Sequence, residues 1–488
     1  MRGKGNPAHV VWLPPLVTPN SLDDFMPDLT VTKEYGLISP RWRNAGALVV
    51  PCALEDKPRE QRRDVMALNL AGAGGHVAVV GGPLSGKSMM LRSIVASLAL
   101  THSPLEVQFY VIDCGGGAFS SMDGLEHVSG IAAGNEDEKV RRTLAEVSGI
   151  IDARERFFKE QRIDGMDAYR RRRAEGKVDD GYGDVFLVID GWGVFRGDYD
   201  ELETKVQQIV ARGLTFGVHV LFSANRWMEI RANISDLIGT KLELRLGDPS
   251  DSQIDRHVAD TVPKGAPGRG LSANKLHTLA ALPRIDGGHD AATVSDGIND
   301  LIAKVRSAWQ GHPHGPKLRL LPENLPYEAM MASVMRQKAS NQLAKGNMVV
   351  GIDENALSPV VFDFNTEPHC YLFGDAGSGK STFLRVIINE IVRSYPDGKA
   401  KIFMLDYRRA NLAQIPQSHF GAYLTNDEQA TESLDALAEF LKTRIPGQDV
   451  TAEQLRDRSW WTGSEVYVLV DDCLLYTSPS PRDISGSR

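Results

Sequence analysis

The fold is decided by the segment Gly81-Gly82-Pro83-Leu84-Ser85-Gly86-Lys87-Ser88, which matches the phosphate-binding pattern G-x-x-x-x-G-K-[ST]. A short, β-branched apolar run precedes this segment, and residues 88–100 have the apolar spacing of a helix. A strand, a glycine-rich loop and a helix in this order point backbone N–H groups and a helix N-terminus at one spot, which suits a phosphate. We therefore predict a nucleotide site in which Lys87 reaches the β- and γ-phosphates and the Ser88 hydroxyl holds Mg²⁺.

The same pattern occurs a second time, as Gly374-Asp375-Ala376-Gly377-Ser378-Gly379-Lys380-Ser381, with Thr382 next to it in the expected cofactor site. An apolar run that ends in an aspartate follows each loop at the same distance from its lysine, at Asp113 and at Asp406. A second apolar run ends at Asp190 in the first copy and at Asp471 in the second. The chain therefore reads as two copies of one module.

These copies predict two tandem RecA-like P-loop NTPase modules, residues 1–311 with a core at about 45–290 and residues 312–472. The apolar runs before the glycine loops and before the aspartates predict buried parallel strands that alternate with helices. Each module is therefore expected to be an α/β parallel sheet with helices on both faces. The second module is expected to be incomplete after Asp471 and to expose a sheet edge and apolar surface. Residues 473–488 are rich in Ser and Pro, and we interpret them as a cloning artefact rather than a genuine disordered terminus.

Each second aspartate ends a strand after several apolar residues, a position from which a carboxylate reaches Mg²⁺ through water. The expected metal ligands are Ser88, Asp190, Ser381 and Asp471. The residues expected to act in catalysis are Lys87, Asp190, Lys380, Asp471 and Asp472.

Hydrolysis needs a further group that orients the attacking water, and a glutamate usually follows the aspartate for this purpose. Gly191 stands there in the first copy, and Asp472, one methylene shorter than glutamate, in the second. We therefore expect tight ATP binding with slow or absent hydrolysis at the first site. Glu201 or Glu203 would be a substitute, but their spacing gives no support for it.

Four polar residues near strand ends have two interpretations each. Asn225 is placed to sense the γ-phosphate and Arg226 to reach a neighbouring subunit's site, or the two cap a loop and form a surface ion pair. Asp113 and Asp406 either contact the site or cap a helix.

The composition excludes several classes of function. Lys and Arg number 55 and Asp and Glu 63, so the net charge of −8 gives no global reason to coat DNA or an anionic membrane. A local basic patch is possible: the run 170–173 is all arginine, although a solvated face is favoured over a phosphate site. The four cysteines lack CxxC spacing, which suits a reducing cytosol. No apolar run reaches the ~18 residues of a membrane span, so attachment to a membrane would need another chain or a missing segment.

Several segments together resemble the FtsK/SpoIIIE-type ATPase modules of EccC, the motor component of the actinobacterial type VII (ESX) secretion system. They are Gly81–Ser88, Asp113-Cys-Gly-Gly-Gly117, Tyr182–Trp192, Phe216-Gly-Val-His-Val220, Leu246–Asp255, Pro267-Gly-Arg-Gly270 and Ser459-Trp-Trp-Thr-Gly463. The resemblance covers about residues 8–472 and is closest to the soluble, EccCb-like half of a split EccC. Asp190-Gly191 is itself typical of the later EccC modules. The pair Trp460-Trp461 is interpreted as core rather than as a docking site.

The resemblance implies a ring, hexameric in this family, at the cytoplasmic face of a membrane channel, held there by a membrane-anchored EccC half or other channel subunits. Its substrates would be WXG100 and PE/PPE-like proteins, whose C-terminal signal docks on the last module. The implied mechanism is ATP-controlled packing between modules. One alternative is a non-hydrolysing, nucleotide-bound receptor for secretion substrates. Another is a DNA translocase, which the acidic net charge disfavours.

Overall fold

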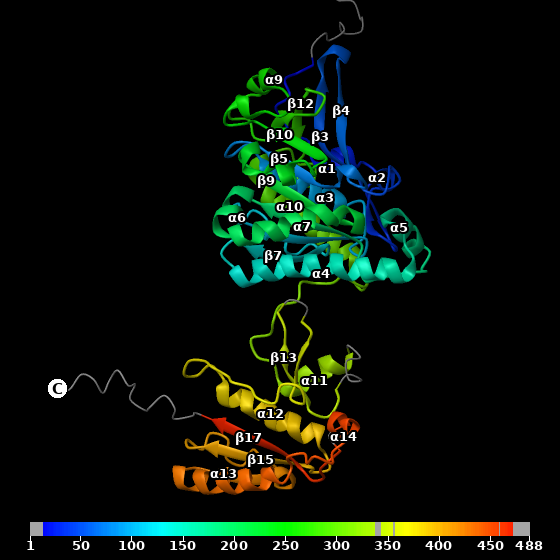
Figure 1. The fold of residues 1–488 in the computed structure, drawn as a ribbon. Helices are drawn as coiled ribbons and strands as arrows, with labels where there is room; N and C mark the ends of the chain where they lie inside the picture. Colours follow the sequence, from blue (N-terminus) through cyan, green and yellow to red (C-terminus); the bar gives the residue numbers. More distant parts are fainter. Residues whose placement is uncertain (1–12, 337–342, 355–356, 458, 472–488) are drawn as a thin grey trace, which may run out of the picture. The chain divides into compact units, whose positions relative to one another are not determined.

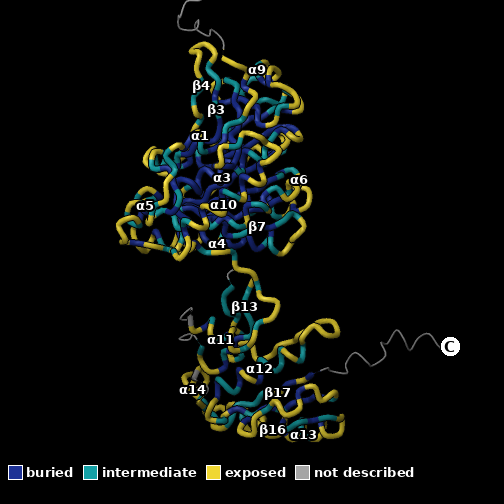
Figure 2. Tube along the Cα trace, turned by 180° about the vertical axis from the view of Figure 1, so that it is seen from behind, coloured by how far each residue is buried: buried dark blue, intermediate teal, exposed yellow. Residues whose placement is uncertain are grey.

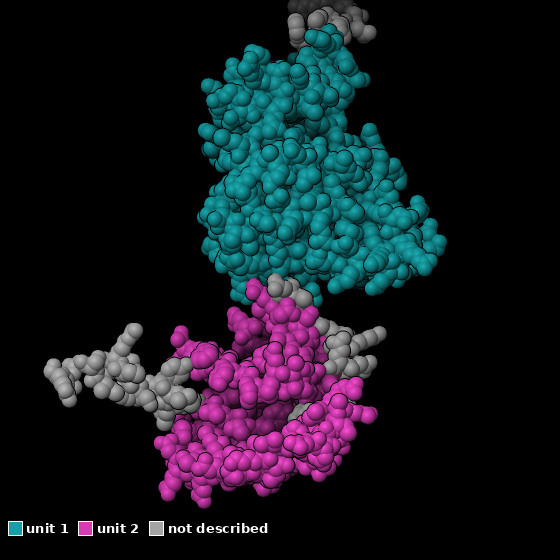
Figure 3. All heavy atoms as spheres, in the orientation of Figure 1, with its two compact units in different colours: residues 1–320 teal, residues 321–488 magenta. Residues whose placement is uncertain are grey.

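The computed structural model describes residues 13–336, 343–354, 357–457 and 459–471. The chain divides into two compact units, residues 1–320 and residues 321–488 (Figures 1 and 3). Asp472 and the tail 473–488 lie outside the described residues, so the expectations for them are not addressed by the structure.

A ten-stranded sheet forms the centre of unit 1. Its strand order is β4 (Arg62–Asn69), β3 (Val49–Lys57), β12 (His277–Ala280), β11 (Arg269–Leu271), β10 (Thr240–Leu244), β5 (Val77–Val80), β9 (Val218–Ala224), β8 (Asp184–Asp190), β6 (Val107–Asp113) and β7 (Val128–Ala133). The strands from β10 to β7 are parallel, which confirms the predicted fold class. Strand β9 lies between the strand before the first glycine loop and the strand that ends at Asp190, so its carboxyl end borders both.

Helices cover both faces of the parallel strands. Val77 and Val79 of β5 pack in one core with α3 (Lys87–Ala99) and α10 (Val294–Trp309). Ala78 and Val80 pack in a second core with α4 (Asp137–Gln161) and α7 (Glu203–Gly213). All residues of β5, β6, β8 and β9 are therefore buried, as expected for strands covered on both faces. Figure 2 shows the buried residues gathered at the centre of unit 1, with exposed residues around them.

The antiparallel half of this sheet was not predicted from the sequence. Strands β11, β12, β3 and β4 continue it beyond β10, each antiparallel to its neighbour. The remaining elements of unit 1 are α1 (Leu22–Phe25), β1 (Thr30–Thr32), β2 (Gly36–Ile38), α2 (Pro40–Arg43), α5 (Met166–Ala174), α6 (Trp192–Asp198), α8 (Ala232–Ser235) and α9 (Arg256–Asp260).

Unit 2 has two small sheets. Strands β13 (Asn347–Ile352) and β14 (Pro359–Asp363) form an antiparallel pair, and β16 (Phe420–Leu424), β15 (Ala400–Asp406) and β17 (Glu465–Asp471) form a parallel sheet in that order. Its helices are α11 (Tyr327–Arg336), α12 (Lys380–Ser394), α13 (Asp427–Lys442) and α14 (Ala452–Asp457). The two modules share one register, because Asp406 pairs with Asp471 as Asp113 pairs with Asp190.

One predicted strand is wrong. The apolar run before the second glycine loop forms no strand, and Tyr371 and Phe373 are 84% and 73% exposed. In unit 1 the corresponding strand β5 takes its backbone hydrogen bonds from β9 and β10. No strand after β17 is described in unit 2, so the described residues give this run no partner on either side.

Candidate nucleotide-binding site

The first glycine loop is fixed by the strand ends around it. Gly81 N donates to Ala224 O at the end of β9 (3.1 Å), and Gly82 N donates to Arg245 O just after β10 (2.8 Å). Ser85 O accepts from Gly268 N (2.8 Å). Gly86 has φ +100°, and a Cβ there would lie 2.8 Å from Gly268 N, so glycine is required at this position. The loop is thereby held in one conformation at the start of α3, whose first N–H groups have no carbonyl partner within the helix.

Lys87 folds back over the loop. Its Nζ donates to Gly82 O (3.0 Å). Burial lowers the pKa of Lys87, and the carboxylates of Asp190 and Glu229 oppose this shift. A partly desolvated ammonium beside free helix N–H groups is a favourable partner for a phosphate.

Asp190 ends β8 as predicted, and the residue is 1% exposed. Oδ1 accepts a hydrogen bond from Ser223 Oγ, whereas Oδ2 is buried with no hydrogen-bond partner among the described residues. Burial raises the pKa of Asp190, and the nearby hydroxyls of Ser223 and Ser88 and the charge of Lys87 oppose it. A buried carboxylate oxygen without a donor, next to the Ser88 hydroxyl, fits the oxygen ligand set that Mg²⁺ takes. These residues therefore fit the implied ion.

The structure shows a role for Asp113 and Asp406 that neither interpretation of the sequence named. Asp113 accepts from the backbone N–H groups of Gly115 (3.1 Å), Gly117 (3.2 Å) and Phe119 (2.8 Å). Asp406 accepts from Ala410 N (3.1 Å) and Asn411 N (2.7 Å). Both aspartates therefore cap the loop that follows their strand.

Gly191 shows why no glutamate follows Asp190. Its φ is +85°, and a Cβ there would lie 2.9 Å from the carbonyl carbon of Cys114. A side chain at this position would be strained by the backbone and would also collide with the neighbouring loop. The proposed substitutes are engaged elsewhere: Glu201 pairs with Arg141, and Glu203 pairs with Arg196 and Arg231.

Two site residues were missed by the sequence analysis, Ser223 and Glu229. Glu229 lies in the turn after β9, where its Oε2 accepts from Asn225 N (2.9 Å). Burial lowers the pKa of Lys87, and the negative charge of Glu229 opposes this shift. A Cβ at Gly193 would lie 2.8 Å from Glu229 Oε2. Its place a few residues after a strand end was the available signal. Asn225 and Arg226 themselves are exposed, and Arg226 lies 3.9 Å from Asp251, in line with the surface ion-pair interpretation.

The second glycine loop has a similar lysine in a more open setting. Lys380 Nζ donates to Gly374 O (2.7 Å) and Asp375 O (2.8 Å), and residues 374–379 are exposed. Ser381 and Thr382 lie in the first turn of α12, and Asp471 ends β17. Asp471 Oδ2 accepts from the side-chain amide of Asn411 (2.7 Å).

Trp460 and Trp461 are not fully buried, so their predicted place in a core is wrong. Trp460 Nε1 donates to Arg444 O (2.8 Å), and the Arg444 guanidinium lies 4.1 Å from the Trp461 ring centre. The pair therefore holds Arg444 at the surface of unit 2.

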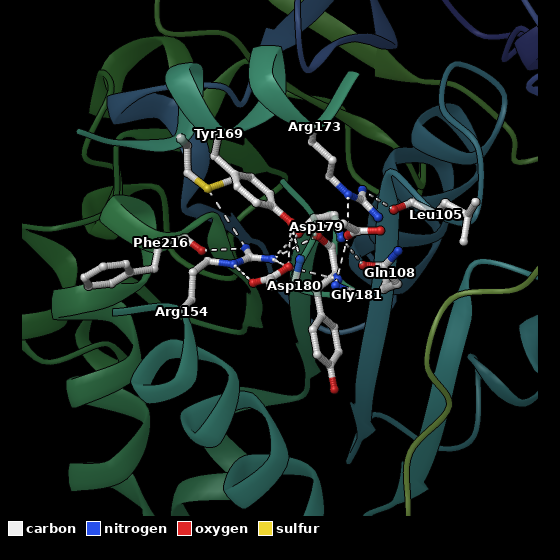
Figure 4. A network of polar contacts seen from close by, with 12 residues as sticks. Leu105, Gln108, Arg154, Tyr169, Arg173, Asp179, Asp180, Gly181 and Phe216 are labelled. Atoms are coloured by element: carbon white, nitrogen blue, oxygen red, sulfur yellow. Dashed lines mark hydrogen bonds and ion pairs between the residues drawn. The ribbon is translucent and has the colours of Figure 1, made fainter. Parts of the chain in front are cut away.

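The arginine run 170–173 does not belong to the glycine-loop site. Figure 4 shows Arg173 beside Asp179, close to Arg154 and Asp180. Arg170 pairs with Asp184 (2.7 Å) at the start of β8, whereas the glycine loop borders the opposite ends of these strands. Arg173 pairs with Asp179 (2.9 Å) beside the buried contact of Arg154 with Asp180 (2.7 Å). The favoured solvated face is therefore wrong for Arg170 and Arg173. The ion pair of Arg170 joins α5 to the start of β8, and that of Arg173 joins α5 to the segment before β8.

Comparison with known proteins places these features in a family. The FtsK/SpoIIIE family model matches residues 51–286 and 330–466, which include both glycine loops. EccCb1 of the ESX-1 secretion system of Mycobacterium tuberculosis is 37% identical over 95% of this chain and 77% of its own length. The chain belongs to the FtsK/SpoIIIE family, in its EccC branch. This EccC-type chain is also 44% identical to EccC of Thermomonospora curvata, over 99% of the present chain and 36% of the relative.

The fold of this EccC-type chain agrees with solved relatives. One solved relative is Thermomonospora curvata EccC (ATPases 2 and 3) in complex with a signal sequence peptide. The match covers 97% of the present chain and 83% of the solved one, with a TM-score of 0.84 and 44% identity. EssC (ATPases 2 and 3) from Geobacillus thermodenitrificans shares the fold with a TM-score of 0.65 at 18% identity. The chain spans about a third of the length of the full EccC relatives (36% and 35%). None of the helices in the described part of the chain has the length and apolar character of a membrane span.

Proposed function

We propose that this chain binds ATP with Mg²⁺ at the first glycine loop, as part of a type VII secretion motor on the cytoplasmic side of the membrane. The observation that carries the proposal is the buried Asp190 Oδ2, which has no hydrogen-bond donor within the described part of the chain and lies near the Ser88 hydroxyl and Lys87. We also propose that the chain forms a ring together with a membrane-anchored EccC half or other channel subunits. This part of the proposal is supported by family membership alone.

The residues would act as follows. The N–H groups of the loop and of the first turn of α3 bind the phosphates, and Lys87 Nζ leaves Gly82 O to join them. Ser88 and Asp190 hold the Mg²⁺, which neutralises phosphate charge when bound. Because Gly191 offers no water-orienting group, binding is tight and hydrolysis weak. Bound ATP then shifts the packing between modules by its differential affinity for two arrangements.

The test is ATP affinity and turnover of the full chain with and without Mg²⁺. Lys87→Ala and Asp190→Asn should each abolish the tight, Mg²⁺-dependent component, and Lys380→Ala is the matched variant in the second loop. Brisk hydrolysis that disappears in Lys87→Ala would contradict the weak-turnover proposal. Tight binding with no hydrolysis at all would favour the receptor alternative. Salt-sensitive DNA binding would favour the translocase.

A groove in unit 2 supports binding of a substrate's signal peptide. In unit 1, Leu318 packs at Gly130 of β7 and its N–H donates to Ser129 O (2.8 Å). In unit 2, a groove of ≈ 320 Å³ lies beside the corresponding strand β16, lined among others by Phe420, Gly421 and Phe440. We propose that it takes the C-terminal signal of WXG100 or PE/PPE-like proteins, as an extended segment beside a sheet edge.

This groove is tested by fluorescence polarisation with a labelled signal peptide. Phe440 is exposed in this structure. Phe440→Ala should weaken binding by about tenfold, since an aromatic side chain that a bound peptide buries dominates such contacts. Leu412→Ala, an exposed apolar residue outside the groove lining, is the matched control. Equal affinities in the two variants would rule the groove out.

A further inference from the structure

The two aspartates at the strand ends differ in what they bind. Asp190 Oδ2 is buried and has no hydrogen-bond partner among the described residues. Asp471 Oδ2 accepts a hydrogen bond from the side-chain amide of Asn411 at 2.7 Å. Asn411 is 0% exposed and Asp471 is 5% exposed, so this hydrogen bond is shielded from water.

The orientation of the Asn411 amide is fixed by its neighbour on the other side. Arg385 of α12 donates from Nε to Asn411 Oδ1 (3.2 Å) and from Nη2 to Ala410 O (2.8 Å). A guanidinium can only donate, so the amide oxygen must face Arg385 and the amide nitrogen must face Asp471. The backbone N–H of Asn411 is also held, by Asp406 Oδ2 at 2.7 Å.

Unit 1 places an apolar side chain at the equivalent position. Arg92 of α3 donates to Ala118 O (3.2 Å), as Arg385 does to Ala410 O. The next residue, Phe119, donates its N–H to Asp113 Oδ2 (2.8 Å), as Asn411 does to Asp406. Phe119 is therefore the structural counterpart of Asn411. Its ring is buried in the unit 1 core and has no N–H to offer.

We propose that Asn411 makes the second glycine loop a nucleotide site with little affinity for Mg²⁺, whereas the first site takes the ion. Each carboxylate has one oxygen that accepts a hydrogen bond, Asp190 Oδ1 from the Ser223 hydroxyl and Asp471 Oδ2 from the Asn411 amide. Mg²⁺ and its waters need carboxylate lone pairs. A hydroxyl can rotate and accept from a metal-bound water, whereas the Asn411 amide nitrogen, fixed by Arg385, can only donate to the carboxylate. Binding the ion would disrupt a charge-assisted hydrogen bond in a buried setting. The inference rests on the proposed function, since it takes the second loop to bind a nucleotide.

The test isolates the second site in the full chain with Lys87→Ala. Affinity for a fluorescent ATP analogue is measured in EDTA and in Mg²⁺, and bound Mn²⁺ is followed by electron paramagnetic resonance. With Asn411 present, Mg²⁺ should leave the nucleotide affinity nearly unchanged. Asn411→Asp keeps an acceptor for Arg385 but removes the donor to Asp471, and Asn411→Leu removes both. Each should raise Mn²⁺ affinity by about tenfold or more, the effect of one hydrogen bond to a charged group.

Two comparisons make the outcome decisive. Adding Asp471→Asn to Asn411→Asp should cancel the gain, because the freed carboxylate is then gone. The Lys380→Ala chain reports the first site, which should hold Mn²⁺ at least tenfold more tightly than the second.

Equal Mn²⁺ affinity at the two sites would overturn the inference even if the Asn411 variants fail to fold. The same Mg²⁺ dependence with and without Asn411 would overturn it while leaving the proposed function intact. Absence of nucleotide from the second site in every variant would overturn both.

Discussion

At the residue scale, the backbone at Gly191 explains why the first site lacks a glutamate, and it yields a prediction. Gly191→Glu should not create hydrolysis, and it should lower the free energy of unfolding by about 1–3 kcal/mol, because φ is +85° and the new Cβ would meet Cys114. Chemical denaturation and single-turnover hydrolysis measure the two effects. Gly197→Glu, where nothing lies within 4 Å of a Cβ, is the control and should be nearly neutral. Efficient hydrolysis by Gly191→Glu would contradict the argument.

Burial lowers the pKa of Lys87, and the carboxylates of Asp190 and Glu229 both oppose this shift. We therefore expect residual hydrolysis at the first site to depend on Glu229. Glu229→Gln keeps an acceptor for Asn225 N and removes the charge. We expect at least a tenfold loss of single-turnover rate with little change in ATP affinity, the effect of losing a group that positions water or accepts a proton. Glu201→Gln, which alters a surface ion pair with Arg141, should leave the rate unchanged. A rate equal to that of the unmodified chain would exclude Glu229 from this role.

At the element scale, two buried histidines make unit 1 sensitive to acid. His76 at the start of β5 donates to Val210 O and accepts from Val220 N, and His127 contacts His102 O. Burial lowers the pKa of each to about 4, below the value of about 6.5 in an unfolded chain. Their stabilisation is therefore complete above pH 6.5 and is lost as the pH falls towards 4, by about 3 kcal/mol each.

Urea denaturation between pH 7 and pH 5 tests this, because ordinary carboxyl groups titrate mainly below that window. The free energy of unfolding of unit 1 should fall across it, and His127→Leu should flatten the slope. His257 is exposed, so His257→Leu is the control. A pH-independent free energy between pH 7 and pH 5 would contradict the prediction.

Elements also show which parts of the fold and site the sequence could predict. The glycine loops, the helices after them and the strands ending at Asp190 and Asp471 were predictable, because each is encoded within a short segment. The strand expected at residues 371–373 was not, because a strand forms only where neighbouring strands pair with it. Glu229 and Asn411 were missed for the same kind of reason, since their roles come from contacts between elements rather than from spacing.

At the scale of the whole molecule, the two units differ in how far their sheets are covered. Leu187 and Ile189 of β8 are 0% exposed, beneath the helices of the second core. Their counterparts in β17, Val468 and Val470, are 43% and 41% exposed. Less apolar area is removed from water per residue in unit 2, so its free energy of unfolding should be the smaller of the two.

This difference predicts two unfolding transitions in calorimetry, the lower one from unit 2. The hydrophobic cores of the two units have no residue in common, so each can be marked by its own variant. Ile391→Ala should lower the first transition and Ile298→Ala the second, each by about 2–5 kcal/mol of stability. ATP with Mg²⁺ at about 100 times its Kd should raise the free energy of unfolding of unit 1 by about 2.7 kcal/mol and so shift the second transition to higher temperature. This gain should vanish in Lys87→Ala. A single transition that both core variants shift together would mean that the units unfold as one, which would contradict the prediction of two transitions.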